Sequence, residues 1–449
     1  SPDIRTAYVY EPSTMNLLYT FATSVQSYGM TPASMAVGGG KWAIGNGNRN
    51  TSTIHVYDLN DLSSAPVELT NSEDTGFGKS IALSSDKMYV GLYKANNRAG
   101  EVRAYDLNDL TASPTIITSP SPKTNDGYFG GDRVEVSGNK VFIGQTKTQD
   151  GNGAVWVYDN DDLSAAPVEI TAPGSHNFNG NGFAWEGGFA TSETHLIVGM
   201  KYSGGSQMHA GYAFVYDIND LSAAPTMLSH PNRSNNDYFG EAVAISSKYA
   251  VVRQKNNNTS IENVYVFDMN DLSAAPTLVT QNTTNDKFGE EIAILDDSIY
   301  ISATFDDDGG TNAGKFYIYD GTDLSTAPQE FAGNAAYNQM GASISPYEAP
   351  SALNGVTVTQ SDNVFTITPG TADSNFTLRI TATDSNGNAT SVTSTFGLNY
   401  VNQAPVISNV DAAYTLTQGQ DTVITAAATD PEGDAITWSF EEVMSGSRY

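Results

Sequence analysis

The sequence contains no cysteine, few basic residues and no long apolar run. Without cysteine, neither disulfides nor thiolate metal sites can hold the chain, so the fold must depend on its core or on bound ions. The 50 Asp and Glu residues outnumber the 21 Lys and Arg residues, for a formal charge of −29. Nucleic acid and membrane insertion are therefore not expected, because the first needs clustered basic residues and the second needs roughly 18 consecutive apolar ones.

What the chain does contain is an internal repeat of about 50 residues. Each copy has four short runs rich in β-branched and aromatic residues, separated by turn-forming residues, which predicts four strands. Seven such units predict an all-β protein with a seven-bladed β-propeller of four-stranded blades over residues 1–348. The repeat is marked by an aromatic-acidic pair at Tyr10-Glu11, Tyr57-Asp58, Tyr105-Asp106, Tyr158-Asp159, Tyr216-Asp217, Phe267-Asp268 and Tyr319-Asp320.

The terminal blade is expected to be closed by both ends of this region. Residues 7–10 and 17–21 supply the last two strands of a blade, whereas residues 337–346 supply a first strand. Joining them removes the exposed sheet edges that would otherwise favour aggregation.

The stretch "FGKSIALSSDKMYVGLYKANNRAGEVRAYD", residues 77–106, resembles the FG-GAP repeat of integrin-α-type propellers. The Phe-Gly pair returns at Phe129-Gly130, Phe239-Gly240 and Phe288-Gly289. Short turns such as "SSDK" stand where that family has its D-x-D-x-D-G calcium loop. The resemblance therefore implies the propeller fold without this calcium loop.

The pattern changes after Tyr347. Residues 349–402 read as half of an immunoglobulin-like sandwich, and residues 403–449 resemble the first half of a cadherin-like domain. We expect the halves to complement each other, within one chain or between neighbouring chains. Exchange between chains would give head-to-tail self-association into a fibre.

The most regular motif, "YDINDLSAAP" at residues 216–225, places carboxylates in the hairpin between third and fourth strands. Asp and Asn at such turns usually bond nearby backbone N–H groups. Because a scaffold is needed in every blade and a catalytic site only once, the motif is interpreted as structural.

Two acidic stretches are candidate calcium sites, since carboxylate and amide oxygens are calcium ligands. The first comprises Asp306, Asp307, Asp308 and Asn312; the alternative is a solvated acidic loop. The second is the turn with Asp430, Glu432 and Asp434, which the cadherin-like resemblance implicates in calcium binding.

No catalytic motif stands out, and the five histidines lie in unrelated contexts, so the protein is not expected to be an enzyme. The long loops at one end of the blades are better candidates, because recognition concentrates on loops of a rigid scaffold. Their aromatic residues beside amides suit a cell-surface glycan; the expected ligand-binding residues are Phe178, Trp185, Tyr202 and His209.

Two function classes follow. The first is a structural or adhesive extracellular protein, a subunit of a fibre or surface appendage assembled through the C-terminal segments. The second is a receptor- or glycan-binding propeller, as in a phage tail fibre or a secreted adhesin. The combination of modules resembles surface and virion fibre proteins of marine bacteria and their phages, which implies an extracellular, cell-surface or virion location.

Overall fold

The computed structural model divides the chain into two compact units, Ser1–Tyr347 and Glu348–Tyr449. The predicted subdivision of the second unit at residue 402 stays a prediction. In the described part, no helix is long and apolar enough to cross a membrane. The structure describes residues 5–10, 17–23, 34–45, 52–59, 64–71, 76–150, 152–173, 183–184, 188–203, 208–256, 261–281, 285–333, 339–340, 342–344, 357–361, 364–368, 376–383, 389–396, 406–408, 418–421, 423, 425 and 427–429.

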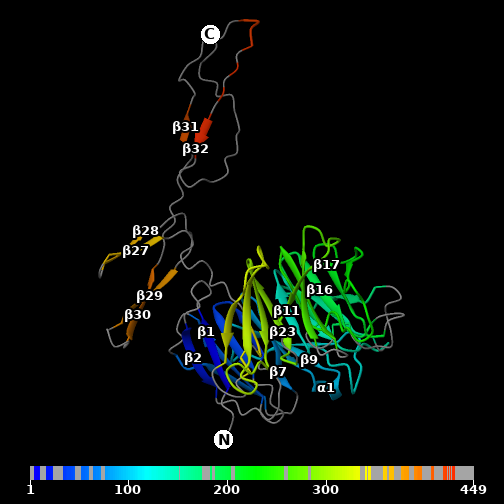
Figure 1. Ribbon diagram of the computed structural model, residues 1–449. Helices are drawn as coiled ribbons and strands as arrows, with labels where there is room; N and C mark the ends of the chain where they lie inside the picture. The colour runs from blue at the N-terminus through cyan, green and yellow to red at the C-terminus, as the bar shows by residue number, and fades with distance from the viewer. Residues whose placement is uncertain are drawn as a thin grey trace. The chain divides into compact units, whose positions relative to one another are not determined.

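Among these residues, the first unit contains six four-stranded antiparallel sheets, each built from consecutive strands (Figure 1). We call each sheet a blade and number the blades in chain order. The first three blades comprise β3 (Met35–Gly38), β4 (Lys41–Gly45), β5 (Ser52–Asp58) and β6 (Val67–Asn71); β7 (Phe77–Leu83), β8 (Lys87–Leu92), β9 (Glu101–Asp106) and β10 (Thr115–Thr118); and β11 (Val134–Ser137), β12 (Lys140–Gln145), β13 (Ala154–Asp159) and β14 (Val168–Thr171).

The next three blades follow the same plan. They comprise β15 (Phe189–Thr191), β16 (His195–Met200), β17 (Tyr212–Asp217) and β18 (Thr226–Leu228); β19 (Val243–Ile245), β20 (Tyr249–Asn256), β21 (Ile261–Asp268) and β22 (Thr277–Thr280); and β23 (Phe288–Leu295), β24 (Ser298–Ala303), β25 (Lys315–Asp320) and β26 (Gln329–Ala332). The prediction of an all-β protein with repeated four-stranded sheets is confirmed.

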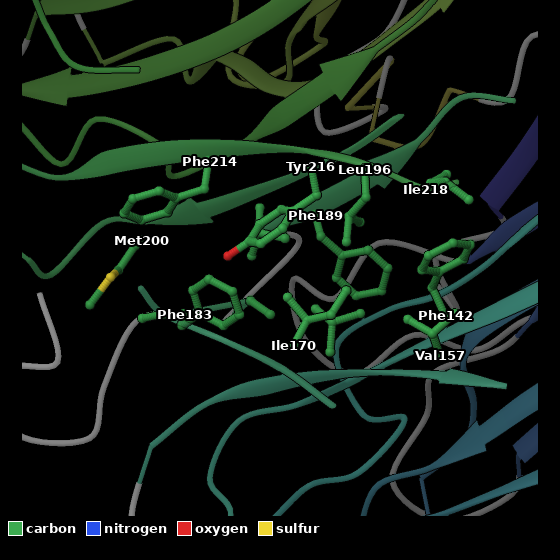
Figure 2. Packing of buried hydrophobic residues seen from close by; sticks show 14 of the residues in the cluster. Phe142, Val157, Ile170, Phe183, Phe189, Leu196, Met200, Phe214, Tyr216 and Ile218 are labelled. Atoms are coloured by element: carbon green, nitrogen blue, oxygen red, sulfur yellow. The ribbon is translucent and has the colours of Figure 1, made fainter. Parts of the chain in front are cut away.

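Adjacent blades pack face to face through apolar layers. Figure 2 shows the layer between the third and fourth blades, a single apolar cluster to which Phe142 and Val157 of the third blade and Leu196 and Phe214 of the fourth belong. Further layers join the first blade to the second, the second to the third, the fourth to the fifth and the fifth to the sixth. Side chains alternate between the two faces of a strand, so one blade can contribute to two layers. Full burial of one such aromatic side chain contributes about 2–3 kcal/mol.

The first strands of consecutive blades also contact one another, from β3 through β7, β11, β15 and β19 to β23. The first strands therefore surround a common axis.

Glycines mark the close approach between blades. A Cβ atom on Gly91 would lie 1.9 Å from the carbonyl oxygen of Gly130 in the next blade. Gly130 itself has φ of 68°, a left-handed conformation that favours glycine. This contact explains the glycine of the Phe129-Gly130 pair.

A further segment begins on the outer face of the sixth blade. Met340 forms a parallel bridge with Gly314, the same bridge that Phe129 forms with Gly100 between the second and third blades. Met340 and Ile344 pack against the apolar side chains of the sixth blade. The described residues 339–340 and 342–344 thus repeat the way in which a blade begins.

The other described elements are short. α1 (Ala95–Arg98) is a single turn between β8 and β9. At the start of the chain, β1 (Arg5–Tyr10) pairs with β2 (Leu17–Thr23). The described residues of the second unit form three two-stranded sheets: β27 (Thr357–Ser361) with β28 (Val364–Thr368), β29 (Phe376–Thr383) with β30 (Ala389–Phe396), and β31 (Val406–Ser408) with β32 (Ala427–Thr429).

Candidate functional site

The repeated hairpin motif is part of the scaffold, as predicted. Asp217 Oδ1 accepts the N–H of Asn219 at 2.8 Å. Asp220 Oδ1 accepts both the N–H and the hydroxyl of Ser222, at 3.2 and 2.6 Å. These bonds hold the pKa of Asp220 below its usual range, the hydroxyl of Ser222 having the largest effect. The Asp220 arrangement recurs at Asp109, Asp162, Asp271 and Asp323.

Several predicted site residues lie outside the described residues. These are the aromatic residues Phe178 and Trp185 and the acidic residues Asp430, Glu432 and Asp434. Their predicted roles stay predictions.

The structure brings the other two predicted ligand-binding residues together with a third aromatic residue. Tyr202 and His209 have ring centroids 5.4 Å apart, and Tyr238 lies 5.7 Å from Tyr202 and 5.5 Å from His209. All three side chains are partly exposed. We call Tyr202, His209 and Tyr238 the Tyr202 cluster. Sequence analysis missed Tyr238, although its place directly before Phe239-Gly240 was a usable signal.

Backbone hydrogen bonds hold the loops of this cluster in place. The N–H of Tyr238 donates to the carbonyl of His209 at 2.9 Å, and the N–H of Asn236 donates to that of Met208 at 2.9 Å. The side chain of Asn235 accepts the N–H of Met208 at 3.0 Å. Met208 and His209, after β16, are therefore bonded to residues 235–238, which lead into the fifth blade.

The charge beneath the Tyr202 cluster is compensated. Lys201 Nζ lies 5.3 Å from the ring centroid of Tyr202, but the residue is only 3% exposed. Glu241 approaches the same ammonium at 3.6 Å. The cluster therefore offers aromatic and amide groups rather than a free charge.

The acidic loop at Asp306–Asn312 is organised around a lysine. Asp306 Oδ1 accepts the N–H of Asp308 at 3.0 Å, and Asp307 Oδ1 accepts the N–H of Asn312 at 2.7 Å. Lys315 Nζ bonds Asp308, donates to Glu330 at 3.2 Å and lies 3.6 Å from Asp306. Burial lowers the pKa of Lys315, but the bonds to Asp308 and Glu330 outweigh burial and raise it above its usual value.

Lys315 therefore supplies a positive charge where calcium was predicted. Among the described residues, no three His, Asp or Glu side chains converge as a metal site would require. The carboxylates of this loop accept hydrogen bonds from its own N–H groups and from the ammonium of Lys315. Calcium binding at Asp306, Asp307, Asp308 and Asn312 stays a prediction.

Charged residues of the third and sixth blades interact with each other. Arg133, just before β11, bonds Glu135 at 2.6 Å and also interacts electrostatically with Glu291 of β23. Burial raises the pKa of Glu291 to about 7, with Arg133 opposing the rise and Glu290 adding to it.

A second charged group was not foreseen from the sequence. Arg253 occupies the position that Gly91 has in the second blade, and it is 4% exposed. Its guanidinium donates to Glu241 at 2.9 Å, to Glu262 at 2.8 Å and to the carbonyl of Phe288 at 2.9 Å. The sequence places Glu241 and Glu262 near Arg253 along the chain, but only the fold shows that the three side chains converge.

Comparison with known proteins agrees with this architecture. The FG-GAP repeat family matches residues 281–319. Together with the six blades, this match identifies the chain as a β-propeller repeat protein. No curated protein sequence matches it.

Similar solved structures share little sequence with the chain. The β-propeller domain of the Trilobed protease from Pyrococcus furiosus is 13% identical, with 65% of this chain and 83% of that chain covered and a TM-score of 0.40. Prolyl oligopeptidase B from Galerina marginata is 12% identical, with 82% and 46% covered and a TM-score of 0.45. Apo AztD from Citrobacter koseri is 12% identical, with 88% and 92% covered and a TM-score of 0.43.

These structures correct the expectation that the protein is not an enzyme. That expectation rested on the lack of a catalytic motif, yet the similar structures include prolyl oligopeptidases, which are enzymes by name. The chain covers only 43 to 46% of their length at 10 to 12% identity. The likeness concerns the fold alone and assigns no activity to this chain.

Replacing Lys315 tests the relation between the lysine and calcium. The substitution Lys315→Gln removes the positive charge that faces Asp306, Asp308 and Glu330. Calcium affinity should therefore rise at least about tenfold, because a unit positive charge a few ångströms away repels the ion. Isothermal titration calorimetry measures the change. Lys248→Gln, which removes an exposed lysine paired with Asp297, serves as the control. Unchanged calcium affinity in Lys315→Gln would contradict this account.

Glu291 should make stability depend on pH. Its folded pKa of about 7 lies above the ordinary glutamate value, so the folded state loses stability as pH rises from about 4.5 to 7. Glu291→Gln should therefore raise the unfolding temperature by a few degrees at pH 8 and have little effect at pH 4. Glu193→Gln, at an exposed position, is the control. If Glu291→Gln changes the unfolding temperature equally at pH 8 and pH 4, ionisation of Glu291 does not destabilise the folded state.

Proposed function

We propose that the protein is an extracellular binding module that recognises carbohydrate through the Tyr202 cluster. The observation that carries the proposal is the convergence of Tyr202, His209 and Tyr238 from two fixed loops. Aromatic side chains give large contact area with few rotatable bonds, so they lose little entropy on binding. The apolar face of a sugar ring can stack on such a surface while its hydroxyls bond nearby polar groups.

The surroundings of the cluster favour an uncharged ligand. The Lys201 ammonium faces Glu241 and is buried, so it does not leave an unbalanced charge for an ion. Asn235 and Asn236 lie in the adjoining loop, and amides can donate to and accept from hydroxyl groups. A neutral cell-surface or environmental polysaccharide is therefore the proposed ligand class.

The scaffold of this module is proposed to be a ring of seven blades. Gln339, before Met340, has φ of 49°, as Tyr128 does before Phe129. At the other end, Trp42 in the first blade is 4% exposed although it points away from the second blade. A seventh blade that begins at Met340 and includes β1 and β2 would cover both outer faces.

A second candidate function concerns the second unit. Its described strands form three two-stranded sheets, and an isolated hairpin is marginally stable in water. This favours further pairing between residues 349–402 and 403–449, as an immunoglobulin- or cadherin-like sandwich within a chain or between chains. Pairing between chains would make a head-to-tail structural or adhesive fibre, with Asp430, Glu432 and Asp434 as its proposed calcium ligands.

Binding to a glycan array of neutral oligosaccharides tests the main proposal. Tyr202→Ala and Tyr238→Ala should each weaken binding of the captured glycan by about tenfold or more, because each removes a stacking surface. Val168→Ala, at a 49% exposed position on an outer strand, should bind like the unaltered protein. If both tyrosine variants bind the glycan as tightly as the unaltered protein, the Tyr202 cluster is not the binding site. If the unaltered protein captures no glycan from the array, the proposed function is wrong.

Sedimentation of the full chain over a wide concentration range tests the fibre. Head-to-tail pairing between chains should give a series of growing assemblies, because a contact between unlike surfaces need not close. A chelator should shorten them if calcium supports the sandwich. A monomer at every concentration, with the C-terminal unit folded, would contradict assembly between chains.

A further inference from the structure

Basic residues are concentrated in one part of this acidic chain. Nine of the 21 Lys and Arg residues lie between positions 79 and 147, where only seven Asp and Glu residues occur. This stretch covers most of the second blade and the first half of the third. A local excess of positive charge on a protein of net charge −29 is a distinct electrostatic feature.

Within this stretch, two lysines and two tyrosines form a second aromatic surface. Tyr93 and Tyr128 have ring centroids 5.9 Å apart. The ammonium groups of Lys79 and Lys94 lie 5.9 and 5.6 Å from the ring centroid of Tyr93. Lys79 is exposed, and the other three residues are partly exposed. We call these four residues the Tyr93 cluster.

The Tyr93 cluster occupies the same end of the blades as the Tyr202 cluster. Tyr128 directly precedes Phe129-Gly130 and has φ of 49°, and Tyr238 directly precedes Phe239-Gly240 and has φ of 48°. In both clusters, the loop after the second strand of one blade meets the residue that leads into the next blade. The two clusters are thus equivalent surfaces, two blades apart.

The side chain of Tyr93 lies close against two glycines. A Cβ atom on Gly76 would lie 2.0 Å from the Tyr93 ring, and one on Gly131 would lie 2.5 Å from Tyr93 Cβ. The N–H of Tyr128 donates to the carbonyl of Arg98 at 3.0 Å, which fixes the second ring to the loop that follows Tyr93. Binding therefore requires little ordering of this surface.

The two clusters differ in charge. Lys201, beneath the Tyr202 cluster, is 3% exposed and faces Glu241, whereas Lys79 is exposed to solvent beside Tyr93. The acidic residue that follows this loop, Glu101, is 7% exposed and bonds Arg103 at 2.9 Å and Asn96 at 3.1 Å. Its charge is already paired, so it does not oppose an anion at Lys79.

We infer that the Tyr93 cluster is a second binding site, which takes an acidic polysaccharide carrying carboxylate or sulfate groups. Tyr93 and Tyr128 contact the apolar face of a sugar ring, and Lys79 and Lys94 contact its anionic substituents. Charge complementarity favours an anion here, and the paired rings favour a sugar over a simple ion. The inference extends the proposed carbohydrate function to a different ligand class at a different site.

The test measures the affinity of the full chain for oligosaccharides of equal length: a uronate oligomer, a sulfated dextran and neutral dextran. The double variant Lys79→Ala/Lys94→Ala should weaken binding of one or both anionic ligands at least about tenfold, and added salt should weaken it further. Tyr93→Ala should weaken the same ligands. The control is Lys140→Ala, which changes the first residue of β12 and should bind these ligands like the unaltered protein.

Each other outcome overturns the inference. If the unaltered protein and the double variant bind the anionic ligands equally, Lys79 and Lys94 do not contact the ligand. If the unaltered protein binds neither anionic ligand, the Tyr93 cluster is not a site for acidic polysaccharide. Equally tight binding of poly-glutamate shows a site for acidic chains in general rather than for sugars. Tyr202→Ala separates the two proposals, because it should weaken binding of neutral glycans only. If this variant loses neutral binding and the unaltered protein binds no anionic ligand, the inference about the Tyr93 cluster is wrong while the proposed function stands.

Discussion

Burial of each sheet between two neighbours is the interaction on which the first unit depends. Five apolar layers join the six blades in chain order, and the first strands contact each other around one axis. A single four-stranded blade has two apolar faces and cannot bury them alone. The outer faces of the first and sixth blades carry Trp42 and Phe316, which are 4 and 9% exposed, so they also need a cover.

This constraint separates what is constant in each blade from what varies. The Asp220-type turn recurs at one end, and the close approach at Gly91 or Gly199 recurs where adjacent blades meet. At the other end, the described loop residues differ from blade to blade, and Tyr93, Tyr128, Tyr202 and Tyr238 are partly exposed there. The Tyr202 and Tyr93 clusters lie in these loops, with similar backbone geometry and different charge.

Periodicity was enough to predict the repeated four-stranded sheets, because each strand and turn depends on local sequence that recurs. The site was only half predictable. Tyr202 and His209 stood out as loop aromatics, but Tyr238 lies 29 residues after His209 and joins them only through tertiary pairing. Lys315 and Arg253 were missed for the same reason: their carboxylate partners are defined by the fold. The expectation that the protein is not an enzyme rested only on the lack of a catalytic motif, and the lack of a motif excludes little.

A crystal structure of the full chain tests the central claim most directly. If stacking between neighbours determines the architecture, the first unit will show seven radial sheets, with Met340–Ile344 as the innermost strand of the seventh and β1 and β2 outside it. The apolar faces around Trp42 and Phe316 will then both lie against that sheet. Six sheets with these two faces in direct contact, or open to solvent, would contradict the account.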